Sequence, residues 1–264
     1  MNWTTSLETE LRTNVIGREV RFFPSVGSTN DLLKHEARAD TTEGLVFVAD
    51  EQVTGRGRRG RSWTAPAGSS VLASILLRPT WLPPSDAFFL TILAAVVAAE
   101  AVESVSGLAV GLKWPNDLQI NGRKLSGVLV ETELDADALH WAVIGCGINC
   151  NWNPRAVPEL AASATSVQAE LGHGIDRRDL LRALLERLDA RYNALRLGAR
   201  SALFDAWRTR LHMLGQPITT TTPHGLLVGV ADDVTPDGAL VVRSEDGQRH
   251  IVTAGDVSVR TSQG

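Results

Sequence analysis

Arginine and glycine alternate in one short segment, Gly55–Arg61, and a tryptophan, Trp63, follows two residues later. Arginine binds carboxylates and phosphates through paired hydrogen bonds, and glycine lets a backbone approach a ligand closely. Each charge-assisted hydrogen bond contributes about 1.5–3 kcal/mol, so two or three arginines hold an anion firmly. The segment lacks the Gly-Lys-Ser/Thr ending of a Walker A loop. It predicts another kind of anion-binding loop, although an isolated Arg/Gly run is also typical of a nucleic-acid-binding tail or a solvated turn.

A second group of polar residues lies in Lys113–Asp117 and Arg123–Gly127, on either side of Asn121-Gly122. The Asn-Gly pair predicts a two-residue type I′ hairpin turn. In that hairpin Ile120 pairs with Arg123, Gln119 with Lys124, and Asp117 with Ser126. Strand alternation puts the polar side chains on one face (Asp117, Gln119, Lys124, Ser126) and the apolar ones on the other (Leu118, Ile120, Leu125). We expect Lys124 to reach the Asp117 carboxylate. A plain solvated hairpin face is the alternative.

The composition is that of a folded protein whose surface as a whole does not suit nucleic acid. The 264 residues carry a net charge of −4 with a pI near 5.9, and nucleic-acid-binding domains are usually strongly basic. Two cysteines, Cys146 and Cys150, are too few for a disulfide framework or a zinc site. The charged N-terminal stretch is unlike a signal peptide, and the longest apolar run, Ala87–Ala99, predicts a buried helix. We expect a cytoplasmic protein without a membrane partner.

Strands and helices are expected to position the two polar segments. Gly44–Ala49 is a β-branched, apolar strand that leads directly into the arginine-rich loop, and strand ends are where α/β proteins bind ligands. Ser28 is expected to cap a helix that ends near Arg38. The other expected elements are strands at Arg18–Phe23, Ser69–Leu77 and Leu139–Ile148, a long helix to about Ser104 stopped by Gly107, a helix capped by Asp176, and a helix over Ser201–Met213. In Gly145–Asn149 the glycines indicate close approach of the backbone to another group.

From Gln216 the pattern changes to short strand-like runs separated by turns. These runs are Ile218–Thr222, Gly225–Asp232, Ala239–Arg243 and Arg249–Val252, a spacing that is typical of a small barrel. We therefore expect two domains, residues 1–214 and residues 215–264.

Taken together and in this order, five segments resemble the signature of the biotin–protein ligases: Ser28-Thr29-Asn30, Gln52 with Gly55–Arg61, Lys113–Asp117, Arg123–Gly127 and Gly145–Asn149. The resemblance covers about Arg18 to Trp152. It implies an α+β fold, with a mixed β-sheet packed with helices as in class II synthetases, plus a small C-terminal SH3-like β-barrel. About seventeen residues precede the first expected strand, too few for the helix-turn-helix domain that some family members carry, so the form without that DNA-binding domain is expected.

The resemblance also implies roles for individual residues. Biotin is expected to contact Ser28, Thr29, Asn30, Gln52, Gly55, Arg56, Gly57, Arg58 and Lys124. ATP and the adenylate are expected to contact Arg56, Arg58, Arg61, Trp63, Asn116, Lys124 and Asn149. The residues expected to act in catalysis are Lys124, Arg58 and Asp117. Asp117 is a candidate ligand of Mg²⁺, and the other metal ligands are left open.

The activity that the resemblance implies has two half-reactions. Biotin and MgATP give biotinyl-5′-AMP, and the biotinyl group then passes to a lysine in the biotin carboxyl carrier domain of an acyl-CoA carboxylase. A lipoate–protein ligase is the nearest alternative, because it uses the same adenylation chemistry on a related fold. A non-enzymatic nucleic-acid-binding module is the alternative from another class, and it predicts salt-sensitive binding without pyrophosphate release.

Overall fold

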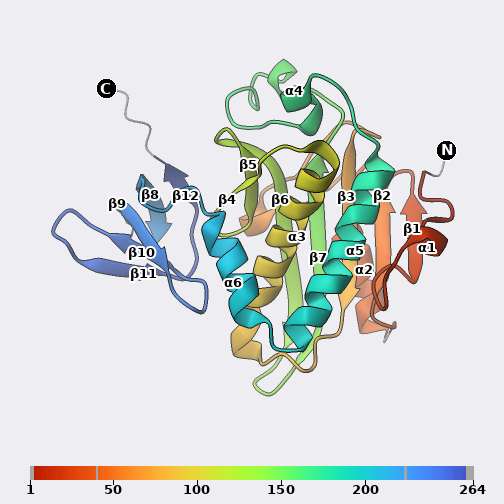
Figure 1. The fold of residues 1–264 in the computed structure, drawn as a ribbon, viewed down its shortest axis with the longest axis horizontal. Helices are drawn as coiled ribbons and strands as arrows, with labels where there is room; N and C mark the ends of the chain where they lie inside the picture. Colours follow the sequence, from red (N-terminus) through yellow and green to blue (C-terminus); the bar gives the residue numbers. More distant parts are fainter. Residues whose placement is uncertain (1–2, 40, 223–224, 260–264) are drawn as a thin grey trace.

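The computed structural model describes residues 3–39, 41–222 and 225–259. Its main body is a seven-stranded sheet in the order β1-β2-β3-β7-β6-β5-β4, in which only β1 and β2 are parallel (Figure 1). The strands are β1 (Glu19–Phe23), β2 (Leu45–Ala49), β3 (Ser70–Leu77), β4 (Gly111–Lys113), β5 (Asp117–Ile120), β6 (Arg123–Leu134) and β7 (Leu139–Asn149). The expected mixed sheet packed with helices is confirmed.

Helices cover both faces of this sheet. In β2, Val46 and Val48 belong to the large core beneath α3 (Phe88–Ser106) and α5 (Arg177–Arg196), whereas Leu45 and Phe47 belong to a smaller core beneath α2 (Thr29–Arg38). Successive strand residues point to opposite faces, so α2 lies on the face opposite α3 and α5. The strand therefore needs apolar residues at every position, as its sequence has.

Helix α3 is the apolar helix that the sequence predicts. The segment Pro84–Ser106 is long and apolar enough to cross a membrane, but 67% of its most apolar window is buried inside the structure. Gly107 ends the helix with φ 70°, and its N–H donates to Glu103 O at 2.9 Å. Its length and composition therefore fit a core helix.

The Asn-Gly hairpin forms with the expected turn but with a different register. Asn121 has φ 52° and Gly122 has φ 75°, as a type I′ turn requires, and Gln119 pairs with Lys124. Asp117, however, pairs with Gly127 and not with Ser126, because a β-bulge interrupts the register after Leu118. Ser126 consequently lies opposite Leu118 and is fully buried. The expectation that Ser126 shares a face with Asp117 was wrong.

The last helix of the main body is shorter than expected. Helix α6 spans Arg200–Thr209, whereas Ser201–Met213 was expected. Its continuation is prevented by pairing with β4, since Leu112 N donates to Arg210 O at 2.7 Å and Leu112 forms a parallel bridge with Leu211. The remaining helices are α1 (Leu7–Glu10) and α4 (Val167–Leu171), with 3₁₀ turns at Arg58–Gly60, Pro84–Asp86 and Pro154–Ala156.

Asp189 on α5 fixes the segment that leads into β1. Its carboxylate accepts hydrogen bonds from the backbone N–H groups of Asn14, Val15 and Ile16 at 2.8–2.9 Å, and the residue is 5% exposed. Helix α5 itself begins where expected, because the side chain of Asp176 accepts from Arg178 N at 2.7 Å. A buried carboxylate stabilises the fold only when hydrogen-bond donors compensate for its loss of water, as these three N–H groups do.

The C-terminal residues form a second sheet of antiparallel strands in the order β11-β10-β9-β8-β12. The strands are β8 (Pro217–Thr222), β9 (Gly225–Val234), β10 (Leu240–Arg243), β11 (Arg249–Val252) and β12 (Val257–Val259), of which β12 was not expected. Within the described residues β11 and β12 are not paired with each other, so the expected small barrel is an open, SH3-like sheet. Trp114 Nε1 donates to Gly238 O at 2.8 Å and fastens this sheet to the main body.

Both cysteines are free and buried in the core of the main body. Burial raises the pKa of the Cys146 thiol to about 12, and it does the same for Cys150. Neither cysteine lies near a cluster of metal-binding side chains in the described ranges.

Candidate functional site

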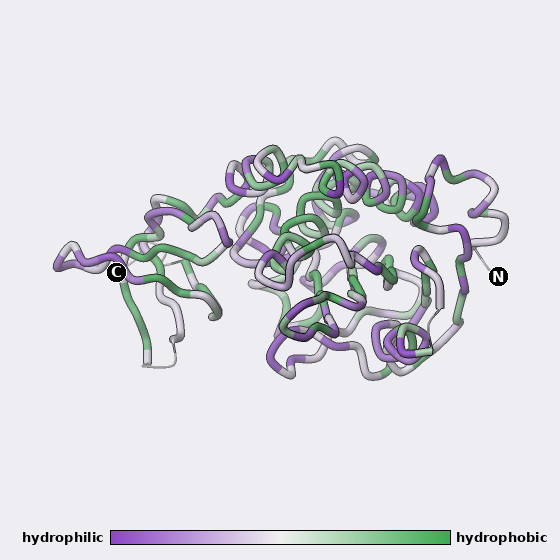
Figure 2. The backbone as a smooth tube through the Cα atoms, turned by 90° about the horizontal axis from the view of Figure 1, so that it is seen from below, coloured by the Kyte–Doolittle hydropathy of each residue, from purple (hydrophilic) through white to green (hydrophobic). Residues whose placement is uncertain are grey.

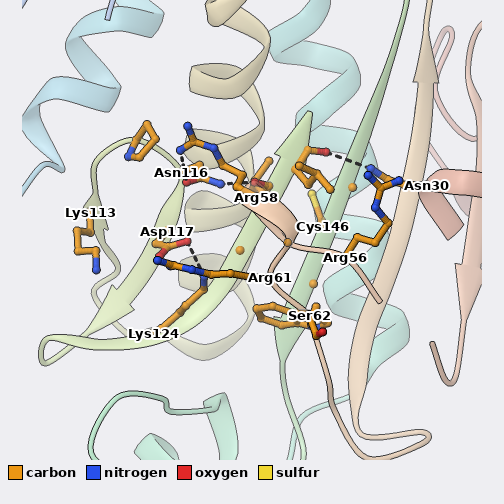
Figure 3. Close-up of a pocket in the computed structure, with 18 of the residues that line it drawn as sticks. Asn30, Arg56, Arg58, Arg61, Ser62, Lys113, Asn116, Asp117, Lys124 and Cys146 are labelled. Atoms are coloured by element: carbon orange, nitrogen blue, oxygen red, sulfur yellow. Dashed lines mark hydrogen bonds and ion pairs between the residues drawn. The ribbon is translucent and has the colours of Figure 1, made fainter. Parts of the chain in front are cut away.

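One pocket brings together nearly all the residues that the sequence singles out (Figure 3). It lies on the α2 side of the main sheet, between the arginine-rich loop and the β4–β5 connection, with residues of β12 at its edge. The sequence-predicted residues in its wall are Ser28, Thr29, Asn30, Gln52, Arg56, Gly57, Arg58, Arg61, Trp63, Asn116, Asp117 and Lys124. Gly55 and Asn149 do not line it. The pocket has about 1040 Å³ of open volume, including the space at its mouth.

One end of the pocket is polar and uncharged. It is formed by the start of α2, where the Ser28 side chain caps the helix by accepting from Asp31 N at 3.4 Å. The backbone N–H and hydroxyl of Thr29 both donate to Gln52 Oε1, at 2.8 and 3.0 Å. Ser28, Thr29 and Asn30 are almost fully buried. This end offers oriented donors and acceptors in a dry environment.

The Asn30 amide is held from both sides by residues that the sequence reasoning missed. Ser74 Oγ donates to Asn30 Oδ1 at 2.5 Å, and Asn30 Nδ2 donates to Glu131 Oε2 at 3.0 Å. Lys34 in turn pairs with Glu131 at 2.7 Å. The i, i+4 spacing of Asn30 and Lys34 on one helix face is a signal that was available in the sequence.

Two glycines of β7 let other side chains lie directly on the sheet. A Cβ atom at Gly145 would stand 2.3 Å from Asn30 Oδ1, and one at Gly147 would stand 2.6 Å from the Trp63 indole. Both distances are far below ordinary contact, so only glycine fits at these two positions. The expected close approach of another group to this strand is confirmed, and the groups are Asn30 and Trp63.

The arginine-rich loop folds as a short hairpin. Gly57 N donates to Arg61 O at 2.7 Å, and Trp63 N donates to Gly55 O at 2.9 Å. A Cβ at Gly55 would stand 2.3 Å from Trp63 O, which explains the glycine that begins the loop. At its tip Arg59 and Gly60 have φ 57° and 74°. The loop is therefore a defined structure that projects its arginines in different directions.

Carboxylates outside the loop hold three of its arginines, since Arg59 also lies 3.5 Å from Asp256. Arg56 pairs with Asp31 on α2 at 2.5 Å, and Arg61 pairs with Asp256, just before β12, at 2.6 Å. Burial alone would raise the pKa of Asp31, but hydrogen bonds from Lys34 and Arg56 lower it below its usual value. The C-terminal sheet thus contributes a carboxylate to the pocket wall, which no sequence motif indicated.

Arg58 differs from its neighbours because its partner is uncharged. Its Nη1 donates to Asn116 Oδ1 at 3.1 Å, across the pocket. Burial lowers the pKa of Arg58, and nearby Asp256 and Asp117 only partly offset this. An arginine remains cationic at neutral pH even so. Its charge is available to an anionic ligand.

Lys124 and Asp117 form the ion pair that the hairpin pattern predicts. The Lys124 Nζ to Asp117 Oδ1 distance is 2.7 Å, and Nζ also lies 5.7 Å from the centre of the Trp63 ring. Five cationic side chains line the pocket against two anionic ones, Asp117 and Asp256. The charged end of the pocket is therefore built for an anion.

Two buried polar atoms beside the pocket lack a hydrogen-bond partner in the part of the chain that the structure describes. These are Asn149 Oδ1 and Trp63 Nε1. Asn149 is 4% exposed, and its Nδ2 donates to Thr165 O at 3.0 Å, so the amide orientation is fixed. An unpaired buried acceptor is uncommon and suits a ligand donor.

No group of three or more His, Cys, Asp or Glu side chains that could hold a metal ion occurs among the described residues. Mg²⁺ in nucleotide sites is usually held by one or two carboxylates together with the phosphates. Asp117 and Asp256 in the pocket wall fit that pattern.

Comparison with known proteins identifies the family. The biotin/lipoate A/B protein ligase family matches residues 22–149, and the biotin protein ligase C terminal domain matches residues 213–260. A biotin–[acetyl-CoA-carboxylase] ligase of Mycobacterium tuberculosis is 33% identical over 261 residues, covering 95% of this chain and 94% of that protein. This chain belongs to the biotin protein ligase family. The C-terminal match favours a biotin ligase over a lipoate ligase within the broader group.

Other members of the biotin protein ligase family are similar over most of the chain. The bifunctional ligase/repressor BirA of Bacillus subtilis is 32% identical over 245 residues, covering 92% of this chain and 75% of that protein. The biotin protein ligase of Aquifex aeolicus, in a structure with biotin and ATP, superposes with a TM-score of 0.78 at 27% identity, covering 93% of this chain and all of that one.

Proposed function

We propose that this protein activates biotin with ATP to biotinyl-5′-AMP and transfers the biotinyl group to a lysine of an acceptor protein. The observation that carries the proposal is the division of one pocket into a neutral hydrogen-bonding end and a cationic end. Biotin has the matching shape, with an uncharged ureido ring at one end and a carboxylate at the other. Lipoate lacks the ureido group that oriented donors and acceptors would bind.

We assign the neutral end to the ureido ring. Ser28, Thr29, Asn30 and Gln52 supply side-chain hydrogen bonds, and Arg56 and Gly57 close the pocket from the loop side. The burial of Thr29 and Asn30 supports this assignment, because hydrogen bonds in a dry site discriminate strongly against ligands that leave them unpaired.

The cationic end is suited to the first half-reaction. A biotin carboxylate oxygen attacks the α-phosphorus of ATP, a new P–O bond forms, and the bond to the β-phosphate oxygen breaks as pyrophosphate leaves. Lys124, Arg56 and Arg58 hold the two anions together and stabilise charge on the α-phosphate. Mg²⁺ bound through Asp117 and the ATP phosphates would neutralise further charge.

The adenosine part is assigned to the surface around Trp63. The indole lies directly against Gly147, and stacking of a base on an aromatic ring contributes about 1–3 kcal/mol. The unpaired Asn149 Oδ1 suits an amino group of the base, while Asn116 and Arg61 belong to the phosphate end.

In the second half-reaction the acceptor amine attacks the carbonyl carbon of the mixed anhydride. The bond from that carbon to the phosphate oxygen breaks, AMP leaves, and the amine loses a proton. We assign Asp117 as the group that orients the amine and takes this proton, since its carboxylate lies in the pocket wall, 2.7 Å from Lys124 Nζ. The protein then needs no covalent nucleophile of its own.

The names of the relatives support the acceptor class, because they specify acetyl-CoA carboxylase. We propose the biotin carboxyl carrier domain of such an enzyme as acceptor, in the cytoplasm, where two free thiols stay reduced. Three of the loop arginines line the pocket, and Arg56 and Arg61 pair with carboxylates of the same chain, which argues against nucleic acid as their partner.

The chain is further proposed to consist of a ligase domain, residues 1–214, and an SH3-like domain, residues 215–264. Figure 2 shows the small sheet as a lobe at one end of the main body. Because Asp256 reaches the pocket, the small domain would take part in catalysis and not only in docking.

One assay tests the proposal. The protein is incubated with biotin, MgATP and a carrier domain, and the carrier is weighed; one added biotinyl group is expected, and none after ATP is omitted. In a parallel arm, biotin is expected to raise the unfolding temperature of the protein and an equal concentration of lipoate is not. An unchanged carrier mass, or stronger stabilisation by lipoate, contradicts the proposed function.

A further inference from the structure

Lys113 lies in the pocket wall but has no role in the assignments above. It is the last residue of β4 and pairs in register with Asp117 on β5, and its side chain is half-buried. Figure 3 shows it at the end of the pocket that holds Asp117 and Arg61, away from Asn30. Lys113 therefore faces the charged end, beyond Lys124 when seen from the neutral end.

Three of the other four cations of the pocket are paired with carboxylates of the protein. Arg56 pairs with Asp31, Arg61 with Asp256, and Lys124 with Asp117. Arg58 bonds an uncharged amide. Within residues 3–39, 41–222 and 225–259, Lys113 makes neither an ion pair nor a side-chain hydrogen bond. Lys113 is therefore the cation in the pocket wall whose charge is not yet bound by another group of the described chain, and it is free to bind an anionic ligand.

Lysine is rare in this chain, which makes its use at this position informative. The sequence has 3 lysines among 26 basic residues. The other two are Lys34, paired with Glu131 and Asp31, and Lys124. A compact, flexible ammonium group binds phosphate as a point charge and follows it as it moves, whereas arginine holds a fixed bidentate geometry.

We infer that Lys113 binds the β- and γ-phosphates of ATP and stabilises the pyrophosphate as it leaves. The inference rests on the proposed function and extends it to the leaving group. When the α-phosphorus bonds to the biotin carboxylate, the electron pair of the breaking bond stays on the β-phosphate oxygen. Negative charge therefore grows on pyrophosphate, and an uncompensated cation beside it stabilises the transition state more than bound ATP.

This role separates the two half-reactions. Pyrophosphate leaves in the first, whereas the second uses only the adenylate and the acceptor amine. Removing the Lys113 charge should therefore slow adenylation and leave transfer from ready-made adenylate unchanged. A general defect of folding or of the pocket would slow both steps alike.

The experiment compares Lys113→Met and Lys113→Arg with the wild-type full chain. Pyrophosphate release in a single turnover with biotin and MgATP measures the first step, and transfer from synthetic biotinyl-5′-AMP to the carrier domain measures the second. Arg182→Met, which removes an exposed helix arginine paired with Asp179, is the control for net charge. Unfolding temperature and biotin affinity report on folding and on the neutral end.

Lys113→Met is expected to slow pyrophosphate release about 10- to 100-fold, the range for a lost charge-assisted contact, with transfer within about twofold of wild type. Lys113→Arg is expected to retain more adenylation than Lys113→Met, and Arg182→Met to match wild type. The inference is overturned if Lys113→Met releases pyrophosphate at a rate within about twofold of wild type. It is also overturned if this variant slows pyrophosphate release and biotinyl transfer equally. A wild-type protein that forms no biotinylated carrier contradicts the proposed function itself, so the two failures are distinguishable.

Discussion

The close contact between Gly145 and Asn30 predicts the effect of adding a single methyl group. In Gly145→Ala the new Cβ would stand 2.3 Å from Asn30 Oδ1, whereas ordinary contacts begin at 3.4 Å. The amide must therefore retreat by about 1 Å. A shift of that size takes it out of reach of Ser74 Oγ, now at 2.5 Å, or of Glu131 Oε2, now at 3.0 Å.

The lost hydrogen bonds set the expected magnitude. A bond to a charged group is worth about 1.5–3 kcal/mol and a neutral one about 1 kcal/mol, so Gly145→Ala should lower the free energy of unfolding by about 2–4 kcal/mol. Urea unfolding measures this loss. Biotin affinity, measured by calorimetry, should fall at least about tenfold, because 1.4 kcal/mol corresponds to that factor.

A second background tests the reasoning itself. In Asn30→Ala the obstructing amide is gone, so adding Gly145→Ala should cost less than about 0.5 kcal/mol. If Gly145→Ala destabilises both backgrounds equally, the clash with Asn30 is not its cause and the account of this glycine is refuted.

Three further predictions concern retention, folding and reactivity. Arg58→Gly should release the adenylate, so that lysines of an added bystander protein are labelled more than with wild type. Arg59→Gly is the control, at an exposed position with φ 57°, and should not increase this labelling. Equal labelling by Arg58→Gly and wild type contradicts the retention role. Asp189→Ala leaves three backbone donors of a buried segment unpaired. It should lower the free energy of unfolding in urea by about 3–5 kcal/mol, against less than about 1 kcal/mol for the exposed Asp179→Ala. Similar losses from both variants would show that the carboxylate does not anchor the segment. Because burial raises the pKa of Cys146 and Cys150 to about 12, about one thiol in ten thousand is ionised at pH 8. Iodoacetamide should therefore leave the native protein unmodified and add two groups after denaturation, as measured by intact mass. Rapid labelling of the native protein would contradict this prediction.

Local sequence signals predicted the fold best where one turn or one cap decides the structure. Asn121-Gly122 requires positive φ at both positions and gave the correct turn, and Ser28 gave the correct helix start. The register beyond the turn was wrong because a β-bulge after Leu118 adds a residue to one strand, which the turn motif does not encode. The predicted end of α6 was also wrong, because the residues that follow the helix pair with β4 instead of continuing it.

The polar composition of the site was predictable, but its internal contacts were not. Residues such as Lys124 and Asp117 lie on one hairpin, so strand geometry alone brings them together. Glu131 and Asp256 were missed because their partners lie 101 and 195 residues away in sequence. Only the three-dimensional arrangement makes them part of the pocket.

The scarcity of lysine has a consequence for the reactive product. A biotinyl adenylate acylates free amines, and arginine side chains stay protonated and do not compete. Two of the three lysines are held by carboxylates, and the other surface cations are arginines. A variant that leaks adenylate therefore offers few targets on its own surface. Fused to another protein as a proximity-labelling tag, it would mark its neighbours with little self-labelling.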